Sequence, residues 1–446
     1  MRRSILRALR QCAAGRGASR NPVKFHGLAT DLSRCHVEAT SKRPVRPTML
    51  PGMRVSGCRE ATRRWRALLA LAIAGVVPLA AGCQSEPPVP PPSAIEAALP
   101  VFPAAEWTRA APATHGFSQD GIDRAIAYAR QQGSTSGMIV HDGTVIAQWG
   151  DVTRKTNLHS ARKSFLSALV GIAAARGQMH LDDTLAQLGI DDTAPALSPA
   201  EKQATVRMLL EARSGVYHPA TYETVQMKAL RPPRGSHAPG TFWYYNNWDF
   251  NTVGAIYERS TGTRIFDALR TELAVPLGMQ DYTPSDGHYV PGGSATRYPA
   301  YPFAMSARDL ARFGLLYLHD GRWRDRQIVP AGWVAESTRP YSDTRTGGYG
   351  YLWWTSDSAS GARGRDALLS RRAFWADGHL GQYAVVVPSL DLVIVSLVDA
   401  RLTSRRMGQT KMETLVMLVE AAGGKATGKA SGNATGNATG SAANAG

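Results

Sequence analysis

Apolar residues recur along this chain with periods that predict both helices and strands. Residues 118–132 open with a serine and have the apolar spacing of a capped helix. Within residues 138–149, two runs rich in β-branched residues flank Asp142-Gly143, which predicts a hairpin with a two-residue turn. Residues 165–173 are apolar at nearly every position. A helix that is apolar on all sides belongs in a core.

The middle of the chain reads as helical, and β character returns in its last quarter. Further helices are expected over 205–212, 251–260, 265–274, 306–318 and 412–421, and strands over 349–354, 372–376, 383–388 and 392–398. The fold class expected from this order is α+β, with one sheet built from both chain ends, flanked by helices, and a mostly helical lobe inserted between them. A cleft between two such lobes is a usual place for a site.

Charge and cysteine are both concentrated at the start of the chain. Residues 1–82 carry 16 Lys and Arg against 3 Asp and Glu, whereas the remaining residues carry 35 against 32. The net charge of +16 therefore belongs to a basic leader, which argues against a nucleic-acid footprint on the folded part. All four cysteines lie within the first 83 residues, so the folded part needs no disulfide and has no thiolate metal site.

The leader ends in a pattern typical of export. Basic residues 59–66 precede an apolar segment, 67–81, that is too short to span a membrane comfortably. Leu79-Ala-Ala-Gly-Cys83 then resembles a bacterial lipoprotein signal, with Cys83 as the lipidated residue and Met53 as the possible true start. We expect an exported protein on the periplasmic face, anchored to the outer membrane. An ordinary secretory signal and an uncleaved anchor are the alternatives.

Two segments of biased composition flank the globular part. Residues 83–104 are rich in proline and are expected to form an extended tether. Residues 423–446 repeat a short Ala/Gly/Thr unit and are expected to be disordered. The predicted hydrolase domain spans 105–422, with a sheet lobe over 105–155 plus 345–422 and a helical lobe over 156–344.

Ser160 and Lys163 stand three residues apart at the head of the apolar helix. Residues at this spacing share one helix face. The positive end of the helix dipole favours an anion near Ser160, and burial drives Lys163 toward the neutral amine that could accept the serine proton. Chance supplies about one or two such pairs in a chain of this length, so the weight of this pair comes from its apolar setting.

Two later stretches could complete a site. Tyr245 and Asn247 lie in an aromatic loop before a helix. A phenol whose pKa is lowered by a neighbouring ammonium could exchange protons with a serine, and an amide could orient either a substrate carbonyl or the lysine. In Asp-Gly-His-Leu-Gly-Gln-Tyr, Gly378 and Gly381 permit close approach of a ligand, and His379 could donate a hydrogen bond. A packed aromatic loop and a structural histidine are the simpler interpretations.

In this order, the three stretches resemble the motifs of the serine β-lactamase and penicillin-binding-protein superfamily, in its class C-like branch. That branch includes esterases and 6-aminohexanoate-dimer hydrolases. The resemblance covers about residues 110–420 and implies a β-lactamase/transpeptidase-like fold with an antiparallel sheet. It also implies that Ser160 is the acylated nucleophile, Lys163 its activating base and Tyr245 the proton shuttle. The backbone N–H groups of Ser160 and Gln382 would form the oxyanion hole.

One departure from the family pattern bears on the substrate. His379 stands where penicillin-binding enzymes carry the lysine that meets a β-lactam carboxylate. We therefore expect hydrolysis of small-molecule esters or amides through an acyl-enzyme, without metal or other cofactor, with membrane contact only through Cys83. Asn247, His379 and Gly381 would lie beside the substrate. Aromatic residues suited to a less charged acyl group are Tyr217, Trp243, Trp248, Trp353 and Trp354.

Two other functions stay open at this point. The protein could be a β-lactamase or D,D-peptidase acting on penicillins or peptidoglycan, or a non-catalytic binding lipoprotein with the same fold. A Ser-His-Asp hydrolase is disfavoured, because the Gly-x-Ser-x-Gly sequence of the nucleophile elbow does not occur.

Overall fold

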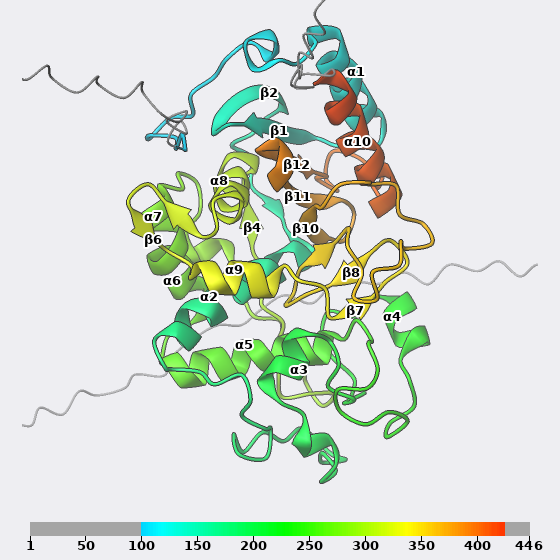
Figure 1. Ribbon diagram of the computed structural model, residues 1–446. Coiled ribbons are helices and arrows are strands. Elements are labelled where there is room, and N and C mark those ends of the chain that lie inside the picture. Colours follow the sequence, from blue (N-terminus) through cyan, green and yellow to red (C-terminus); the bar gives the residue numbers. More distant parts are fainter. Residues whose placement is uncertain (1–99, 424–446) are drawn as a thin grey trace, which may run out of the picture. The chain divides into compact units, whose positions relative to one another are not determined.

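The computed structural model describes residues 100–423 (Figure 1). The predicted leader over 1–82, the tether up to residue 99 and the tail beyond residue 423 lie outside these residues. Within the described part, no helix combines the length and the apolar character needed to cross a membrane.

The centre of the fold is an eight-stranded antiparallel sheet with the strand order β2-β1-β12-β11-β10-β9-β8-β7. The N-terminal hairpin of β1 (Ser136–His141) and β2 (Thr144–Gly150) joins the C-terminal strands through pairing of β1 with β12. The expected α+β fold, with one sheet built from both ends of the chain, is confirmed (Figure 1). The other strands are β7 (Ser342–Asp343), β8 (Gly348–Tyr349), β9 (Trp354–Thr355), β10 (Phe374–Gly378), β11 (Gln382–Val387) and β12 (Leu392–Leu397).

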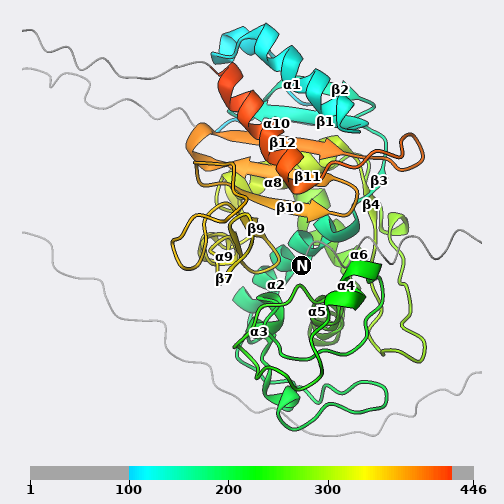
Figure 2. The ribbon, with the colours of Figure 1, turned by 90° about the vertical axis from the view of Figure 1, so that its right-hand side faces the viewer.

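Helices cover both faces of this sheet. Helices α1 (Gln119–Gln131) and α10 (Gln409–Ala422) lie side by side on one face, and α8 (Ala307–Leu318) packs on the other (Figure 2). Strand β12 is therefore apolar on both sides, with Val393 and Ile394 in separate core clusters. This double burial explains the continuous apolar runs in the C-terminal strands, because a sheet with one wet face would alternate.

A second group of helices lies beyond one end of the sheet, below it in Figure 1. Helix α2 (Arg162–Ala175) enters this group from the sheet side, and every residue from Arg162 to Ala173 is buried, as its apolar sequence predicts. Helices α3 (Val206–Leu210), α4 (Val225–Leu230) and α5 (Asn247–Thr261) complete this group. Helices α6 (Ile265–Ala268), α7 (Val275–Leu277) and α9 (Ala331–Ser337) lie beside the sheet, at the height of its lower strands in Figure 1.

Two expected elements differ from the structure. The run predicted as one strand over 349–354 is a tight hairpin, because the Gly350 N–H donates to the carbonyl of Trp353 and folds β8 back onto β9. The helix expected over 265–274 is α-helical only to Ala268 and continues as a π-helix over Leu269–Ala274.

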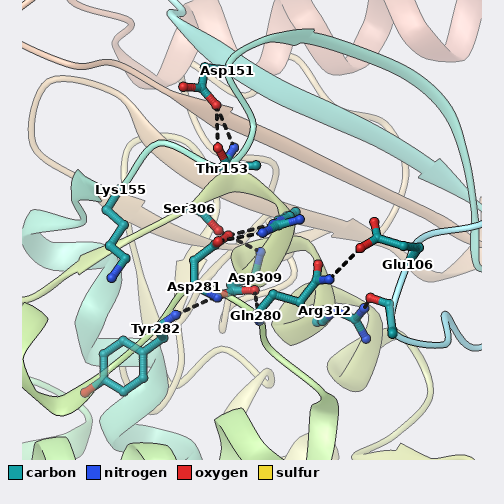
Figure 3. Close-up of polar contacts among 12 residues, drawn as sticks. Glu106, Asp151, Thr153, Lys155, Gln280, Asp281, Tyr282, Ser306, Asp309 and Arg312 are labelled. Atoms are coloured by element: carbon teal, nitrogen blue, oxygen red, sulfur yellow. Dashed lines mark hydrogen bonds and ion pairs between the residues drawn. The ribbon is translucent and has the colours of Figure 1, made fainter.

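A polar network fixes the start of α8 (Figure 3). The buried Asp309 carboxylate accepts the backbone N–H groups of Gln280, Asp281 and Tyr282 at 2.8–2.9 Å, and Ser306 caps the helix as predicted. The residues just before Ser306 form β4 (Ala304–Met305), which pairs with β3 (Thr156–Asn157). Because β3 leads directly into Ser160, this network also supports the segment that carries the candidate nucleophile.

Candidate active site

The chain turns sharply between β3 and Ser160. The Asn157 side chain accepts the His159 N–H at 2.9 Å, and His159 has a left-handed backbone with φ of 47°. Residues His159–Ala161 form a 3-10 turn, and α2 begins only at Arg162. Ser160 thus precedes the helix instead of lying inside its first α-turn, as the sequence had suggested. Three-residue periodicity still places Ser160 and Lys163 on the same side.

Lys163 is the centre of the site. Its Nζ lies 2.8 Å from each of Ser160 Oγ, Tyr245 OH and Asn247 Oδ1. The residue is 1% exposed, and its Nζ also lies 4.7 Å from the centre of the Phe250 ring. The three side chains that the sequence suggested as partners of Lys163 are therefore all in contact with it.

The surroundings of Lys163 disfavour its ammonium form. Burial, and then the positive charge of Arg162, hold the pKa of Lys163 well below its usual range, while Asp377 acts in the opposite direction. A neutral amine has a free lone pair, so it can accept a proton from a hydroxyl 2.8 Å away. The geometry therefore suits a general base toward Ser160.

Tyr245 is held by aromatic neighbours. Its ring stacks on Trp354 with centroids 5.5 Å apart and lies 4.9 Å from that of Phe250. Burial raises the pKa of Tyr245. The expectation that a neighbouring ammonium would lower this pKa is wrong in direction, because burial dominates and Lys163 itself tends to be neutral. Tyr245 is thus placed to act as a phenol that passes on a proton.

Asn247 begins α5, which starts four residues earlier than expected because Asn246 caps it by accepting the Trp248 N–H. The Asn247 Oδ1 accepts a hydrogen bond from Lys163 Nζ, and the Asn247 Nδ2 donates to the carbonyl of Tyr222 at 2.7 Å. With both ends of the amide bound to protein, the geometry favours orientation of the lysine over contact with a substrate carbonyl.

The turn from β10 to β11 forms the opposite wall. Gly381 has φ of 118°, and a Cβ there would come within 2.7 Å of Met407. The close approach expected at this glycine is therefore made by the protein's own chain. The Gln382 side chain is fully buried and bonds both the N–H and the carbonyl of Val398, so only the backbone of Gln382 remains for an oxyanion.

His379 is exposed and meets the His159 ring edge-on, with centroids 5.7 Å apart. Burial and the nearby Arg406 lower the pKa of His379. Burial, and then the neighbouring basic side chains of His379, Arg162 and Lys163, lower the pKa of His159 to about 4. Both rings are therefore neutral at neutral pH, unlike the lysine that the family pattern has at position 379.

Ser160, Tyr245 and His379 line one pocket of about 780 Å³. Sequence reasoning missed three further parts of its lining: residues 223–227, which lead into α4, Asp377 and Arg406. Helix α4 has no buried residue, and this explains why no apolar periodicity marked it. The sequence offered one signal for Asp377, because this residue opens the Asp-Gly-His-Leu-Gly-Gln-Tyr stretch that contains His379.

The aromatic residues expected near the acyl group divide between the pocket and the core. Trp354 lines the pocket, whereas Trp248 and Trp353 are fully buried. Over residues 100–423, no group of three or more His, Cys, Asp or Glu is arranged to hold a metal ion.

The sheet flanked by helices, with Ser160 and Tyr245 in contact with the buried Lys163, is typical of β-lactamase-like serine hydrolases. The Beta-lactamase family model matches residues 122–413, and the chain belongs to this family. Its members are serine hydrolases.

Several known proteins are similar to this chain in structure or in sequence. A putative 6-aminohexanoate-dimer hydrolase from Bacillus anthracis superposes with a TM-score of 0.50 at 18% identity, over 67% of this chain and 81% of that one. A putative beta-lactamase from Bacteroides dorei gives 0.50 at 17% identity, over 68% and 99%. An uncharacterized protein of Alkalihalophilus pseudofirmus is 23% identical over 292 residues, which is 58% of this chain and 82% of the relative. At these identities the structural matches establish the fold alone.

Proposed function

We propose that this protein hydrolyses esters or small amides through an acyl-enzyme formed on Ser160. The observation that carries the proposal is the contact of Lys163 Nζ with both Ser160 Oγ and Tyr245 OH at 2.8 Å inside a buried site. The Ser160 hydroxyl also lines the pocket, so it can reach a bound carbonyl carbon.

The geometry suggests the following order of events. Ser160 Oγ attacks the carbonyl carbon while its proton moves to the Lys163 amine, and the backbone N–H groups of Ser160 and Gln382 stabilise the oxyanion. The proton then passes through Tyr245 to the leaving alcohol or amine as its bond to the carbonyl carbon breaks. Water, deprotonated by the same groups, releases the acid and restores the serine hydroxyl.

The walls of the pocket favour a substrate with an uncharged acyl part. Trp354, Val225 and Met227 supply aromatic and apolar surface, and the neutral His379 lacks the fixed positive charge of a lysine. A second candidate, action on β-lactams or cell-wall peptides, is favoured by one observation. The exposed Arg406 lines the same pocket and could meet a carboxylate.

A substrate panel separates these candidates. We expect kcat/KM for a short-chain p-nitrophenyl ester to exceed that for nitrocefin by about 100-fold or more, which corresponds to about 2.7 kcal/mol of transition-state stabilisation. Steady-state rates of the purified protein on both substrates measure this ratio. Faster turnover of nitrocefin would instead assign the protein to the β-lactamases.

We also propose that the mature protein is exported and held at the outer membrane through a lipid on Cys83. The support is the sequence from residue 59 to residue 84, which lies outside the described residues. Cells fed radiolabelled palmitate should yield a labelled membrane-bound protein, and Cys83→Ala should lose the label and leave the membrane fraction. Equal labelling of both forms would contradict the anchor.

A further inference from the structure

Arg162 is a fully buried cation directly behind the candidate nucleophile. Its side chain has no measurable exposure, and its guanidinium lies over the rings of Tyr301 and Tyr222, 4.7 Å and 5.3 Å from their centroids. Nη1 donates to the carbonyl of His159 at 2.8 Å. Nε and Nη2 have no hydrogen-bond partner in the described protein, so the guanidinium is not bonded to a carboxylate.

A buried guanidinium without a carboxylate partner is unusual in a protein core. A buried charge is costly unless it is paired, and a guanidinium stays protonated in proteins. Arg162 is neither a lining residue of the pocket nor exposed to solvent. Its function therefore has to be sought in its effect on the neighbouring groups, of which Lys163 is the next residue.

The charges around Lys163 are few. Arg162 is the positive group that acts most on it, and Asp377 on β10 is the negative one. The remaining neighbours, Tyr245, Asn247 and Ser160, are uncharged hydrogen-bond partners. Burial raises the pKa of Asp377 to about 7, while Lys163 and a hydrogen bond from Tyr383 act in the opposite direction. Near neutral pH the Asp377 carboxyl is therefore only partly ionised, and protonating Lys163 would put a second positive charge beside that of Arg162 in a desolvated site.

We propose that Arg162 is a positioning residue whose buried positive charge, bonded to no carboxylate, keeps the neighbouring Lys163 as the neutral amine that can accept the Ser160 proton. The proposal rests on the proposed function and specifies how that site is held ready at neutral pH. The bond from Arg162 to the His159 carbonyl adds a second effect, because it braces the turn that carries Ser160.

The test is the pH dependence of Ser160 labelling by a fluorophosphonate, followed on the full chain by intact-mass spectrometry between about pH 5 and pH 10. Without Arg162, a proton on Lys163 no longer meets a second positive charge, and Asp377 stabilises that proton where its carboxyl is ionised. In wild type the labelling rate should rise with pH as Lys163 loses its proton, and we call this pH range the rising limb. In Arg162→Met we expect the rising limb to lie at least about one pH unit higher, which means about tenfold slower labelling at a given pH on that limb. The rate should recover at high pH.

Two further variants keep the test decisive. Arg162→Lys keeps the charge and should keep the limb near its wild-type position, even if the maximal rate falls. Asp377→Asn removes the opposing charge and should move the limb to lower pH, and adding Asp377→Asn to Arg162→Met should bring the limb back down. Thermal melts establish whether Arg162→Met is folded. If it is not, Arg162→Gln, which also removes the charge, carries the test against Arg162→Lys.

The outcomes separate the inference from the function on which it depends. Loss of rate at all pH values with an unmoved limb in Arg162→Met would overturn the electrostatic role of Arg162 while leaving Ser160 as the nucleophile. Failure of the wild-type protein to label at Ser160 at any pH would instead overturn the proposed function.

Discussion

Alanine in place of Ser160 is expected to reduce ester hydrolysis by about 10⁴-fold or more. The acyl-enzyme forms through the serine Oγ, and the neighbouring Lys163 and Tyr245 are placed to move protons rather than to attack. The fold should survive, since Ser160 Oγ contacts only the side chains of Lys163 and Tyr245 among the described residues and lies at the edge of the pocket. Initial rates on a p-nitrophenyl ester, together with a thermal melt, measure both effects.

Ser164 provides a matched control for this variant. It lies one turn further along α2, is buried away from the pocket, and donates to the carbonyl of Leu352 at 2.9 Å. Ser164→Ala should lower stability by about 1 kcal/mol, as expected for loss of a buried hydrogen bond, and leave turnover nearly intact. A Ser160→Ala protein that kept full activity would show that another group is the nucleophile.

Methionine in place of Lys163 is expected to lower kcat by about 10³-fold, the usual range for loss of a general base. The side chains have similar length, so the helix packing should be retained. The variant removes only the amine that contacts Ser160, Tyr245 and Asn247. Lys202→Met, at an ion pair with Asp191 whose lysine is 30% exposed, is the control and should retain activity.

Stability should change with pH in a defined direction. The pKa of Lys163 is depressed in the folded protein, so between that pKa and about 10.5 the unfolded chain binds a proton that the folded chain lacks. Wild-type stability should therefore rise with pH across this window. Lys163→Met lacks this penalty, and its stability relative to wild type should decline as pH rises. Denaturant unfolding at several pH values tests this. A relative stability that is independent of pH would contradict a buried neutral lysine.

Local signals were sufficient for much of the fold. Helix α2 was visible because its residues are apolar on all sides, and the hairpin was visible because Asp142 and Gly143 both take the positive φ that such turns need. The Ser306 cap could likewise be seen in the sequence. Each of these depends on residues close together in the chain, where propensity and capping act directly.

The pocket depended on contacts that no local pattern encodes. Trp353 and Trp354 are adjacent in sequence, yet the first lies in the core and the second lines the site, because the turn between β8 and β9 points them apart. The roles of Arg162 and Asp377 were also hidden, since the first reads as one more residue of the helix. Their effect on the pKa of Lys163 follows from the folded structure, in which α2 carries Arg162 and β10 brings Asp377 near the same amine.

Peptide mapping after reaction with a fluorophosphonate tests the assignment of Ser160 most directly. We expect the adduct on the peptide that contains Ser160 in the wild-type protein, slowed strongly in Lys163→Met and absent in Ser160→Ala. An unlabelled wild-type protein, or an adduct on a different residue, would contradict a serine hydrolase that works through Ser160.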